Sequence, residues 1–538
     1  MDIVQCLRRF GAPNLRELAG ETLLRAVEAC APTNMEKDLS EVILMRYGKG
    51  ILGVKAVRQM LIDTLSEAEA LELTRECGLS GTSHIERCIK LQQYFVSFSA
   101  EKSKQLVSFL QLPSSFEIVT SRDPRETTET LNGGRGTNVE LKGYLHEYQK
   151  QLKDEIMLCL RNQGTRFLVQ MPTGAGKTFT ALEALVDAFR APNHQKFIVW
   201  LVDSNELAEQ ALESFRFLWT VKGDRKLMVS RLFGGFMPDF QTLLEGGMVF
   251  ASFDKFHSAL SNSTHSGHLS IRHLIRNTDI LVVDEAHASV AKTYRDCIDA
   301  FIFTDHTSVM GLTATPGRAN PMETEELADV FSKNLITLRD KAGKVVDDPI
   351  RFLQKGKYLA ELKGELLETG VNINDAAEET ICRRLAADPE RNKRILDQIE
   401  LAHKARESTV VFACSLDHVY ALKVLAKTRE VPCDLIVGAT PQSERLEILN
   451  RFKKREFFIL INLEILSTGI DIPKMQRLLI TKPIGSPILY SQIIGRALRG
   501  PNNGGNDVNT VVNLKDNLLN FPSANLLYTY FWEDWAKN

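Results

Sequence analysis

The segment MPTGAGKT, residues 171–178, has the composition of a phosphate-binding loop and lies between an apolar strand and a helical run. Gly174 and Gly176 leave room for backbone N–H groups to wrap an anion at a helix N-terminus. Lys177 can reach the β- and γ-phosphates, and the Thr178 hydroxyl can hold Mg²⁺. Met171 stands where this loop usually has its first glycine. The loop predicts ATP and Mg²⁺ as cofactors, bound by Thr173, Gly174, Ala175, Gly176, Lys177 and Thr178.

The segment LVVDEAH, residues 281–287, places two acids at the end of another apolar strand. Asp284 can organise the Mg²⁺ shell, and Glu285 can orient or deprotonate an attacking water molecule. Adjacent acids after a strand are also common in solvated loops. Their place downstream of the phosphate-binding loop, with strands between, favours the catalytic interpretation.

The segment QIIGRALR, residues 492–499, brings two arginines about one helical turn apart, so one helix face can present both guanidiniums. An arginine supplied by a second domain stabilises charge on a transferring phosphoryl group, typically by roughly three to five orders of magnitude in rate. The alternative is a basic surface helix. The candidate catalytic residues are therefore Lys177, Asp284, Glu285, Gln492, Arg496 and Arg499.

The elements that must position these residues are two series of short apolar runs. RFLVQM, KFIVWLVD, MVFAS, DILVVD and SVMGLTA form the first, and TVVFAC, CDLIVG, FFILINL, RLLIT and NTVVNL form the second. Continuous Val/Ile/Leu runs with helical segments between them are typical of parallel sheets covered by helices. They predict two α/β domains in tandem, joined by a charged, mostly helical connector.

The beginning of the chain has a different pattern. Apolar residues recur at three- and four-residue steps, which predicts an all-helical domain. Two capping boxes are predicted at helix starts, formed by Ser66 with Glu69 and by Ser83 with Glu86. A polar, glycine-bearing stretch follows and is typical of a linker. The predicted parts are a helical N-terminal domain (1–120), a linker (121–139), a first parallel-sheet domain (140–318), a helical connector (319–400) and a second parallel-sheet domain (401–538).

Composition excludes several classes of protein. The chain has 538 residues, 66 Lys/Arg against 68 Asp/Glu and a net charge of −2, which argues against a polybasic coating protein but allows one local basic groove. No uncharged apolar run is long enough to span a membrane. The nine cysteines include no C-x-x-C pair, so neither a disulfide scaffold nor a zinc ribbon is indicated. We expect a soluble, cytoplasmic protein.

The three motifs and their flanks resemble the superfamily 2 helicases and translocases. The likeness is greatest to the DEAH-type group that includes the type III and type I restriction motor subunits, and it covers about residues 140–520. This resemblance implies an α/β fold of two tandem RecA-like parallel-sheet domains preceded by an all-helical N-terminal domain. It also implies ATP hydrolysis between the two domains, driving movement along a nucleic acid, with DNA favoured over RNA.

The resemblance assigns further residues. Gln149 in LHEYQ matches the glutamine that reads adenine, and Thr313 and Thr315 in GLTATP match the hydroxyls that couple hydrolysis to movement. Gly469 and Asp471 in LINLEILSTGIDIP match positions near the nucleotide. The positions that match contacts to a nucleic-acid backbone are Ser204, Asn205, Gln210, Ser252 and Thr468.

One departure bears on the subgroup. Ile493 follows Gln492, where many relatives carry an arginine, and this favours the restriction-type group. The sequence has no nuclease pattern and no evident zinc or iron–sulfur ligand set, so a restriction-type motor would need its nuclease on another chain. The likeness also suggests genome defence or repair, by analogy alone.

Three alternatives to a DNA motor stay open on the sequence. An RNA helicase is the nearest, because contacts to a 2′-hydroxyl do not show in sequence. An ATP-gated nucleic-acid sensor or clamp is favoured by the helical N-terminal domain, which a bare motor would not need. A metabolic P-loop kinase fits least, because it would lack the second domain with its arginines. The N-terminal domain could bind a protein partner or a DNA feature, or simply cap the motor.

Overall fold

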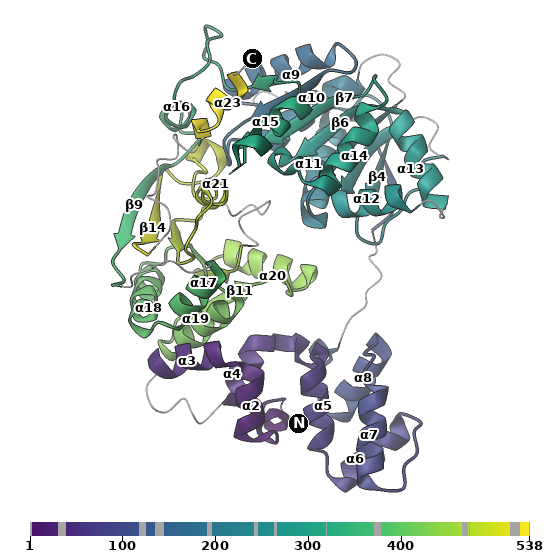
Figure 1. Cartoon of the computed structure of the whole chain (residues 1–538), viewed down its shortest axis with the longest axis vertical. Helices are drawn as coiled ribbons and strands as arrows, with labels where there is room; N and C mark the ends of the chain where they lie inside the picture. The colour runs from purple at the N-terminus through teal and green to yellow at the C-terminus, as the bar shows by residue number, and fades with distance from the viewer. Residues whose placement is uncertain are drawn as a thin grey trace.

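The computed structural model has three parts, a helical domain and two parallel-sheet domains (Figure 1). The helical domain lies at the bottom of the view, the first sheet domain at the top and the second along the left side. The structure describes residues 3–30, 39–117, 125–134, 145–190, 196–241, 246–262, 266–318, 320–370, 378–464, 472, 474–516 and 528–536.

The N-terminal part is all-helical, as predicted, and its helices share one apolar core that includes Leu7, Ile51 and Leu91. Its elements are α1 (Ile3–Arg8), α2 (Gly11–Ala19), α3 (Glu21–Cys30), α4 (Leu39–Tyr47), η2 (Gly48–Gly53), α5 (Lys55–Asp63), α6 (Glu67–Glu76), α7 (His84–Tyr94), α8 (Ala100–Phe109) and η3 (Ser114–Phe116).

The two predicted helix starts form with one difference. Ser66 and Glu69 make the full capping box, in which each side chain accepts from the other residue's backbone N–H. Ser83 accepts from the Glu86 N–H, but the Glu86 carboxylate bonds the N–H and hydroxyl of Thr82. The second box is therefore only half formed, because Thr82 offers two donors to the same carboxylate.

The first sheet has eight strands in the order β1-β4-β5-β3-β6-β7-β2-β8, and every pair is parallel except β1 with β4. The strands are β1 (Thr128–Leu131), β2 (Arg166–Gln170), β3 (Phe197–Val202), β4 (Leu227–Leu232), β5 (Gly247–Ser252), β6 (Thr278–Asp284), β7 (Ser308–Thr313) and β8 (Leu335–Ile336). Helices on both faces are α9 (Glu147–Leu160), α10 (Lys177–Phe189), α11 (Asn205–Lys222), α12 (Phe253–Ser261), α13 (Ser266–Arg276), η4 (Ala286–Ala288), α14 (Lys292–Ile302) and α15 (Pro321–Val330). Strands β3, β5 and β7 are buried throughout, which explains their continuous apolar runs.

The second sheet has six parallel strands in the order β11-β12-β10-β13-β14-β9. They are β9 (Glu361–Leu367), β10 (Thr409–Phe412), β11 (Cys433–Ile436), β12 (Ile459–Asn462), β13 (Arg477–Ile480) and β14 (Val508–Leu514). The remaining helices are α16 (Pro349–Lys355), α17 (Glu378–Ala387), α18 (Pro389–Lys404), α19 (Leu416–Thr428), α20 (Gln442–Lys453), α21 (Pro487–Gly495), η6 (Pro501–Asn503) and α23 (Trp532–Ala536).

Part of the predicted linker belongs to the first sheet. Residues 128–131, inside the 121–139 stretch, form β1 antiparallel to β4, and the hydroxyls of Thr128 and Ser230 lie 2.9 Å apart. Because β1 is a short edge strand with three of its four residues partly or fully exposed, it needs no apolar run. Linker composition was therefore misleading here.

The predicted connector, 319–400, is divided between the two sheets. Strand β8 extends the first sheet beside β2, and β9 extends the second beside β14. Strand β9 has an exposed edge and a polar sequence, ELKGELL, so no buried-strand pattern marks it. The second sheet domain accordingly begins at 361 rather than 401. Residues 528–536 were predicted to belong to the second sheet domain (401–538). Their side chains pack into the first domain instead.

The helical domain is docked on the second sheet domain. Leu23, Ala26 and Val27 of α3 lie in one apolar core with side chains of α19 and of the second sheet. Two ion pairs flank this core, Arg46 with Asp417 at 3.2 Å and Lys427 with Glu41 at 2.7 Å. Figure 1 shows α3 and α4 against the lower face of that domain. The N-terminal domain is therefore packed as an extension of the second domain.

Among the described residues, no helix combines the length and apolarity needed to cross a bilayer.

Candidate nucleotide cleft

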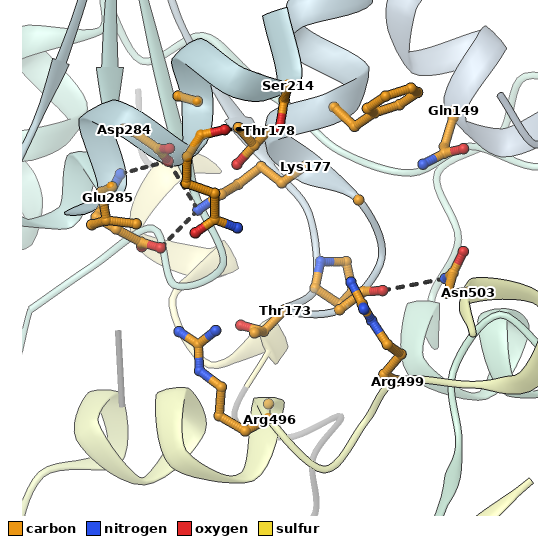
Figure 2. Close-up of a pocket in the computed structure, with 18 of the residues that line it drawn as sticks. Gln149, Thr173, Lys177, Thr178, Ser214, Asp284, Glu285, Arg496, Arg499 and Asn503 are labelled. Carbon is orange, nitrogen blue, oxygen red and sulfur yellow. Dashed lines mark hydrogen bonds and ion pairs between the residues drawn. The ribbon is translucent and has the colours of Figure 1, made fainter. Parts of the chain in front are cut away.

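A cavity of about 430 Å³ lies between the two sheet domains (Figure 2). Both domains supply its walls. The first contributes His146, Gln149, Pro172, Thr173, Gly174, Gly176, Lys177, Thr178, Phe179, Leu207, Gln210, Ala211, Ser214, Asp284 and Glu285, and the second contributes Ile472, Gly495, Arg496, Arg499 and Asn503.

The phosphate-binding loop connects β2 to α10 and lines the cavity. Gly174 and Gly176 have φ angles of +82° and +87°, a left-handed conformation that favours glycine. A side chain at Gly176 would also collide with the Gln149 amide. The loop ends at the N-terminus of α10, where backbone N–H groups and the helix dipole favour an anion.

Lys177 forms the centre of the charged wall. Its Nζ donates to Glu285 Oε1 at 3.1 Å and lies 3.4 Å from Asp284 Oδ1 (Figure 2). Burial alone would lower the Lys177 pKa, but the two carboxylates outweigh it and raise that pKa. Burial opposes ionisation of Glu285 too, yet Lys177, His287 and Arg496 hold its pKa below the usual value. Glu285 is therefore a carboxylate at neutral pH. Burial raises the pKa of Asp284 against the attraction of Lys177.

The backbone turns sharply between the two acids. Asp284 is the last residue of β6, and Glu285 has a φ of +50° in the left-handed region, which is uncommon for a residue with a side chain. The Glu285 N–H donates to Asp284 Oδ1 at 3.0 Å. This conformation, which costs of order 1–3 kcal/mol, lets both carboxylates line the same cavity.

The two arginines follow the end of α21 in the second domain and line the opposite wall of the cavity (Figure 2). The prediction that one helix face presents both is wrong, because α21 ends at Gly495 and Arg499 lies in an isolated β-bridge with Leu359. The approach of the domains is close, because a Cβ added to Gly495 would lie 2.5 Å from Thr173 Cβ. Arg496 also lowers the pKa of Glu285 through its charge. The cleft thus brings Arg496 and Arg499 to the same cavity as Lys177, 319 or more positions away in the sequence.

A hydrogen-bonded chain crosses the cleft beside the cavity. Gln492 Nε2 lies 3.1 Å from His287 Nε2, and His287 Nδ1 lies 3.2 Å from Thr313 Oγ1. The Thr313 hydroxyl donates to the Thr315 carbonyl and accepts from the Thr315 N–H. Gln492, Thr313 and Thr315 are thus linked by hydrogen bonds. Thr315 takes part through its backbone N–H and carbonyl and not through its hydroxyl.

Gln149 is buried beside the loop. Its Oε1 accepts from the His146 N–H at 2.8 Å, and its Nε2 donates to the Ala175 carbonyl at 3.1 Å. These two bonds leave one hydrogen on Nε2 and one lone pair on Oε1 available. An adenine edge would need one such donor and one such acceptor.

His146 and Asn503, at the same end of the cavity, were not among the predicted site residues. Asn503 of the second domain donates to the Gly174 carbonyl at 3.2 Å and lies 3.0 Å from His146 Nε2. His146 stands within LHEYQ, so the motif could have indicated it. Asn503 and Ser214 carry no local signal, because only the packing of distant elements brings them to the cavity.

The predicted nucleic-acid contacts divide between two places. Ser204, Asn205 and Ser252 line a second cavity of about 440 Å³ at the carboxyl ends of β3 and β5, together with Lys255. Gln210 does not, and it lines the cavity between the two sheet domains instead. The reason is helical geometry, because five residues along α11 rotate a side chain by about 140°. Thr468, Gly469 and Asp471 lie outside the described residues.

The cavity suits Mg²⁺. Thr178 and Asp284 both line it with oxygen donors, the ligands this ion prefers. Mg²⁺ usually takes only one or two protein ligands and completes its shell with phosphate and water, so two oxygens are enough. Among the described residues, no group of three or more Asp, Glu, His or Cys side chains is arranged to hold a metal ion by itself.

The chain matches two protein families over separate segments. Residues 142–318 match the family described as type III restriction enzyme, res subunit. Residues 391–501 match the helicase conserved C-terminal domain. The first segment contains the phosphate-binding loop and the two acids, Asp284 and Glu285. The second segment contains Arg496 and Arg499.

Relatives share about a quarter of the matched residues. The putative ATP-dependent helicase IRC3 of Saccharomyces cerevisiae is 26% identical over 66% of this chain and 49% of its own length. The type I restriction enzyme EcoKI endonuclease subunit of Escherichia coli is 24% identical over 66% of this chain and 33% of its own. A fragment of a putative HsdR subunit from Vibrio vulnificus has a TM-score of 0.48 and 17% identity, over 69% of this chain and 64% of that one.

The fold and the matched segments define a protein with two RecA-like domains of the helicase type. The chain belongs to the superfamily 2 helicases and is related to the restriction motor subunits. It spans about half the length of IRC3, one of the curated relatives it matches.

Proposed function

We propose that this chain is an ATP-dependent helicase or translocase that acts on a nucleic acid, with DNA favoured over RNA. The observation that carries the proposal is the two-walled cavity, with Lys177 on one side and Arg496 and Arg499 on the other. A single-domain ATPase has no use for guanidiniums on a second domain, whereas a motor can make hydrolysis depend on domain closure.

The chemistry follows from the positions of the side chains. The loop N–H groups and Lys177 bind the phosphates, and the ionised Glu285 orients the attacking water and accepts its proton. Water attacks the γ-phosphorus, the bond to ADP breaks, and the guanidiniums stabilise the charge spread over the transferring group. Mg²⁺, held by Thr178 and Asp284, would supply further neutralisation of the phosphate charge.

A nucleic-acid strand would run across the carboxyl ends of the strands in both sheets. Ser204, Asn205 and Ser252 lie at carboxyl ends of the first sheet, where ligands of open α/β sheets bind. Across the gap, Arg445 of α20 pairs with Glu206 of α11 at 3.1 Å. A strand bound at this edge therefore contacts elements that join the two domains, so it can favour closure and stimulate hydrolysis.

Phosphate release measured by stopped flow tests this proposal. The protein is given ATP and Mg²⁺ alone, or with single-stranded, duplex or forked DNA, or with the matching RNAs. At least a tenfold stimulation by one of these ligands supports the proposal. Equal rates with and without every nucleic acid would refute it. A stronger response to RNA than to DNA would reverse the substrate while leaving the motor intact.

A second candidate is a sensor or clamp that hydrolyses ATP without travelling. The docking of α3 and α4 on the second domain favours it, because that domain would carry the whole helical part with it on closure. A strand-displacement assay and a translocation assay beside the ATPase assay separate the two functions. Stimulated hydrolysis with neither displacement nor travel would favour the clamp.

Partners and pathway are further parts of the proposal. The N-terminal domain offers a surface for a protein partner, and a nuclease on another chain would complete a restriction-type assembly. The similarity to a type I restriction subunit supports genome defence as the setting. Co-purification from the native host, followed by a nuclease assay of the complex, tests both points.

A further inference from the structure

Residues 528–536, here called the strap, follow the second domain in the sequence and pack on the first domain. Tyr528, Phe531 and Trp535 are 3%, 4% and 6% exposed. Tyr528 lies in the apolar core on one face of the first sheet, and Trp535 lies in the core on the other face. Figure 1 shows the yellow α23 beside the first domain, close to α15. One short segment therefore joins both layers of the first domain.

The first attachment of the strap is Gln170. This fully buried residue is the last of β2 and precedes the phosphate-binding loop. Its Nε2 donates to the carbonyls of Tyr528 at 2.7 Å and Ala314 at 3.2 Å, and its Oε1 accepts from Trp532 Nε1 at 2.7 Å. The Tyr528 hydroxyl donates to the Gln170 carbonyl at 3.1 Å. The side-chain amide of Gln170 is thus hydrogen-bonded to the strap and to the loop after β7.

The second attachment is the loop after β7, residues 314–317. Trp535 Nε1 donates to the Pro316 carbonyl at 2.6 Å. The Phe531 ring lies against Gly317 so closely that any side chain there would collide with it. This loop contains Thr315, which bonds Thr313 in the chain that leads to Gln492. The strap therefore supports both the loop that faces the phosphates and the loop that leads to the second domain.

The other end of this stretch of chain is equally well anchored. Asp516 pairs with Arg391 in the core of the second domain, and both side chains are almost fully buried. Tyr528 follows twelve positions later, a length that spans at most about 40 Å. The two anchors thus belong to different domains and lie twelve positions apart in the sequence.

We propose that the strap positions the 171–178 and 314–317 loops for ATP hydrolysis, and that Trp532 and Trp535 are positioning residues. The inference rests on the proposed function. Without an indole N–H, a buried oxygen loses its partner, and the loop that carries it becomes free to shift. Catalysis by oriented groups is sensitive to shifts of this kind, since a displacement of 1 Å can cost about a hundredfold in rate.

The test compares tryptophan-to-phenylalanine variants. Trp535→Phe and Trp532→Phe each remove one indole N–H of the strap. Trp219→Phe is the matched control, because buried Trp219 donates to the Arg225 carbonyl at 3.1 Å at the end of α11, away from both loops. The turnover number and KM for ATP are measured with saturating nucleic acid. We expect the strap variants to lose about five- to tenfold in kcat with KM within twofold, and the control to change neither. Strap variants with the kcat of Trp219→Phe would overturn the proposal.

A second readout does not depend on activity. Hydrogen–deuterium exchange of residues 311–318 reports on the order of the loop after β7. We expect faster exchange in Trp535→Phe than in Trp219→Phe. Equal exchange in the two variants would also overturn the proposal that the strap orders this loop. A wild-type protein that does not hydrolyse ATP would refute the proposed function, while the exchange comparison would still decide on the strap. If Trp535→Phe does not fold, the half-buried Trp532 provides the second variant.

Discussion

Gln492 and His287 are joined by a hydrogen bond of 3.1 Å across the cleft between the two sheet domains. The amide nitrogen of Gln492 can only donate, so His287 Nε2 accepts and the ring proton resides on Nδ1, which faces Thr313 Oγ1 at 3.2 Å. This interdomain contact therefore requires a neutral imidazole. Burial lowers the pKa of His287, with Lys177 and Arg318 acting in the same direction and Glu285 opposing them.

Acidification should open this contact. The folded-state pKa lies below the unfolded value of about 6.5, so the His287 contribution to stability is complete above that value and is lost as the pH falls through the folded pKa. We expect kcat for ATP to decline on the acid side of about pH 6.5. In Gln492→Glu, a carboxylate can accept from the imidazolium, so the decline should move to lower pH. Identical normalised pH profiles for the two proteins would exclude His287 as the titrating group.

Arg496→Ala should bind nucleotide almost normally and turn it over at least a hundredfold more slowly, because in the proposed mechanism the Arg496 guanidinium acts on charge that develops only during the reaction. Binding of a fluorescent ATP analogue and steady-state hydrolysis measure the two effects. Arg451→Ala, on the exposed part of α20, is the control and should change neither. Wild-type turnover by Arg496→Ala would remove this residue from catalysis.

Lys177→Ala should weaken nucleotide binding as well as turnover, since in the proposed mechanism Lys177 contacts the phosphates before the reaction as well as during it. We expect at least a tenfold increase in the Kd of the same analogue. Lys150→Ala, on the exposed side of α9, should leave the Kd unchanged. A normal Kd for Lys177→Ala would mean that the loop N–H groups alone hold the phosphates.

Arg391→Leu should destabilise the second domain severely. Arg391 and Asp516 are 0% and 1% exposed and pair at 2.5 Å, so the substitution leaves a buried carboxylate without its partner. Losing one member of a buried pair costs about 3–5 kcal/mol. Arg451→Leu breaks a half-exposed pair with Asp434 and should cost less than about 1 kcal/mol. Urea unfolding compares them, and similar losses for both variants would contradict the prediction.

Leu23→Arg should detach the helical domain from the second sheet domain. Leu23 is completely buried in the shared core, and a charge cannot remain there. Small-angle scattering should then give a larger radius of gyration, and limited proteolysis should release the N-terminal helices. Ile85→Arg, at a position that is 71% exposed on α7, should do neither. An unchanged scattering curve for Leu23→Arg would show that other contacts hold the domain.

Sequence patterns predicted the strands that are buried on both faces of a sheet. Strands β3, β5 and β7 are buried on both faces, so their apolar runs are unbroken. Strands β1 and β9 lie at sheet edges with one side exposed, and their polar sequences, TETL and ELKGELL, were assigned to a linker and a connector. The periodicity signal fails at an edge because only part of the strand is removed from water.

The sequence by itself determined the loop that can wrap a phosphate, the acids that follow a buried strand and the helical character of the first part, because each depends on neighbouring residues. Only the tertiary structure decided that Arg496 and Arg499 line the cavity of Lys177, that Gln210 lines it too, and that the strap returns to the first domain. These relationships join residues distant along the chain. They depend on how domains pack, and no local pattern records that.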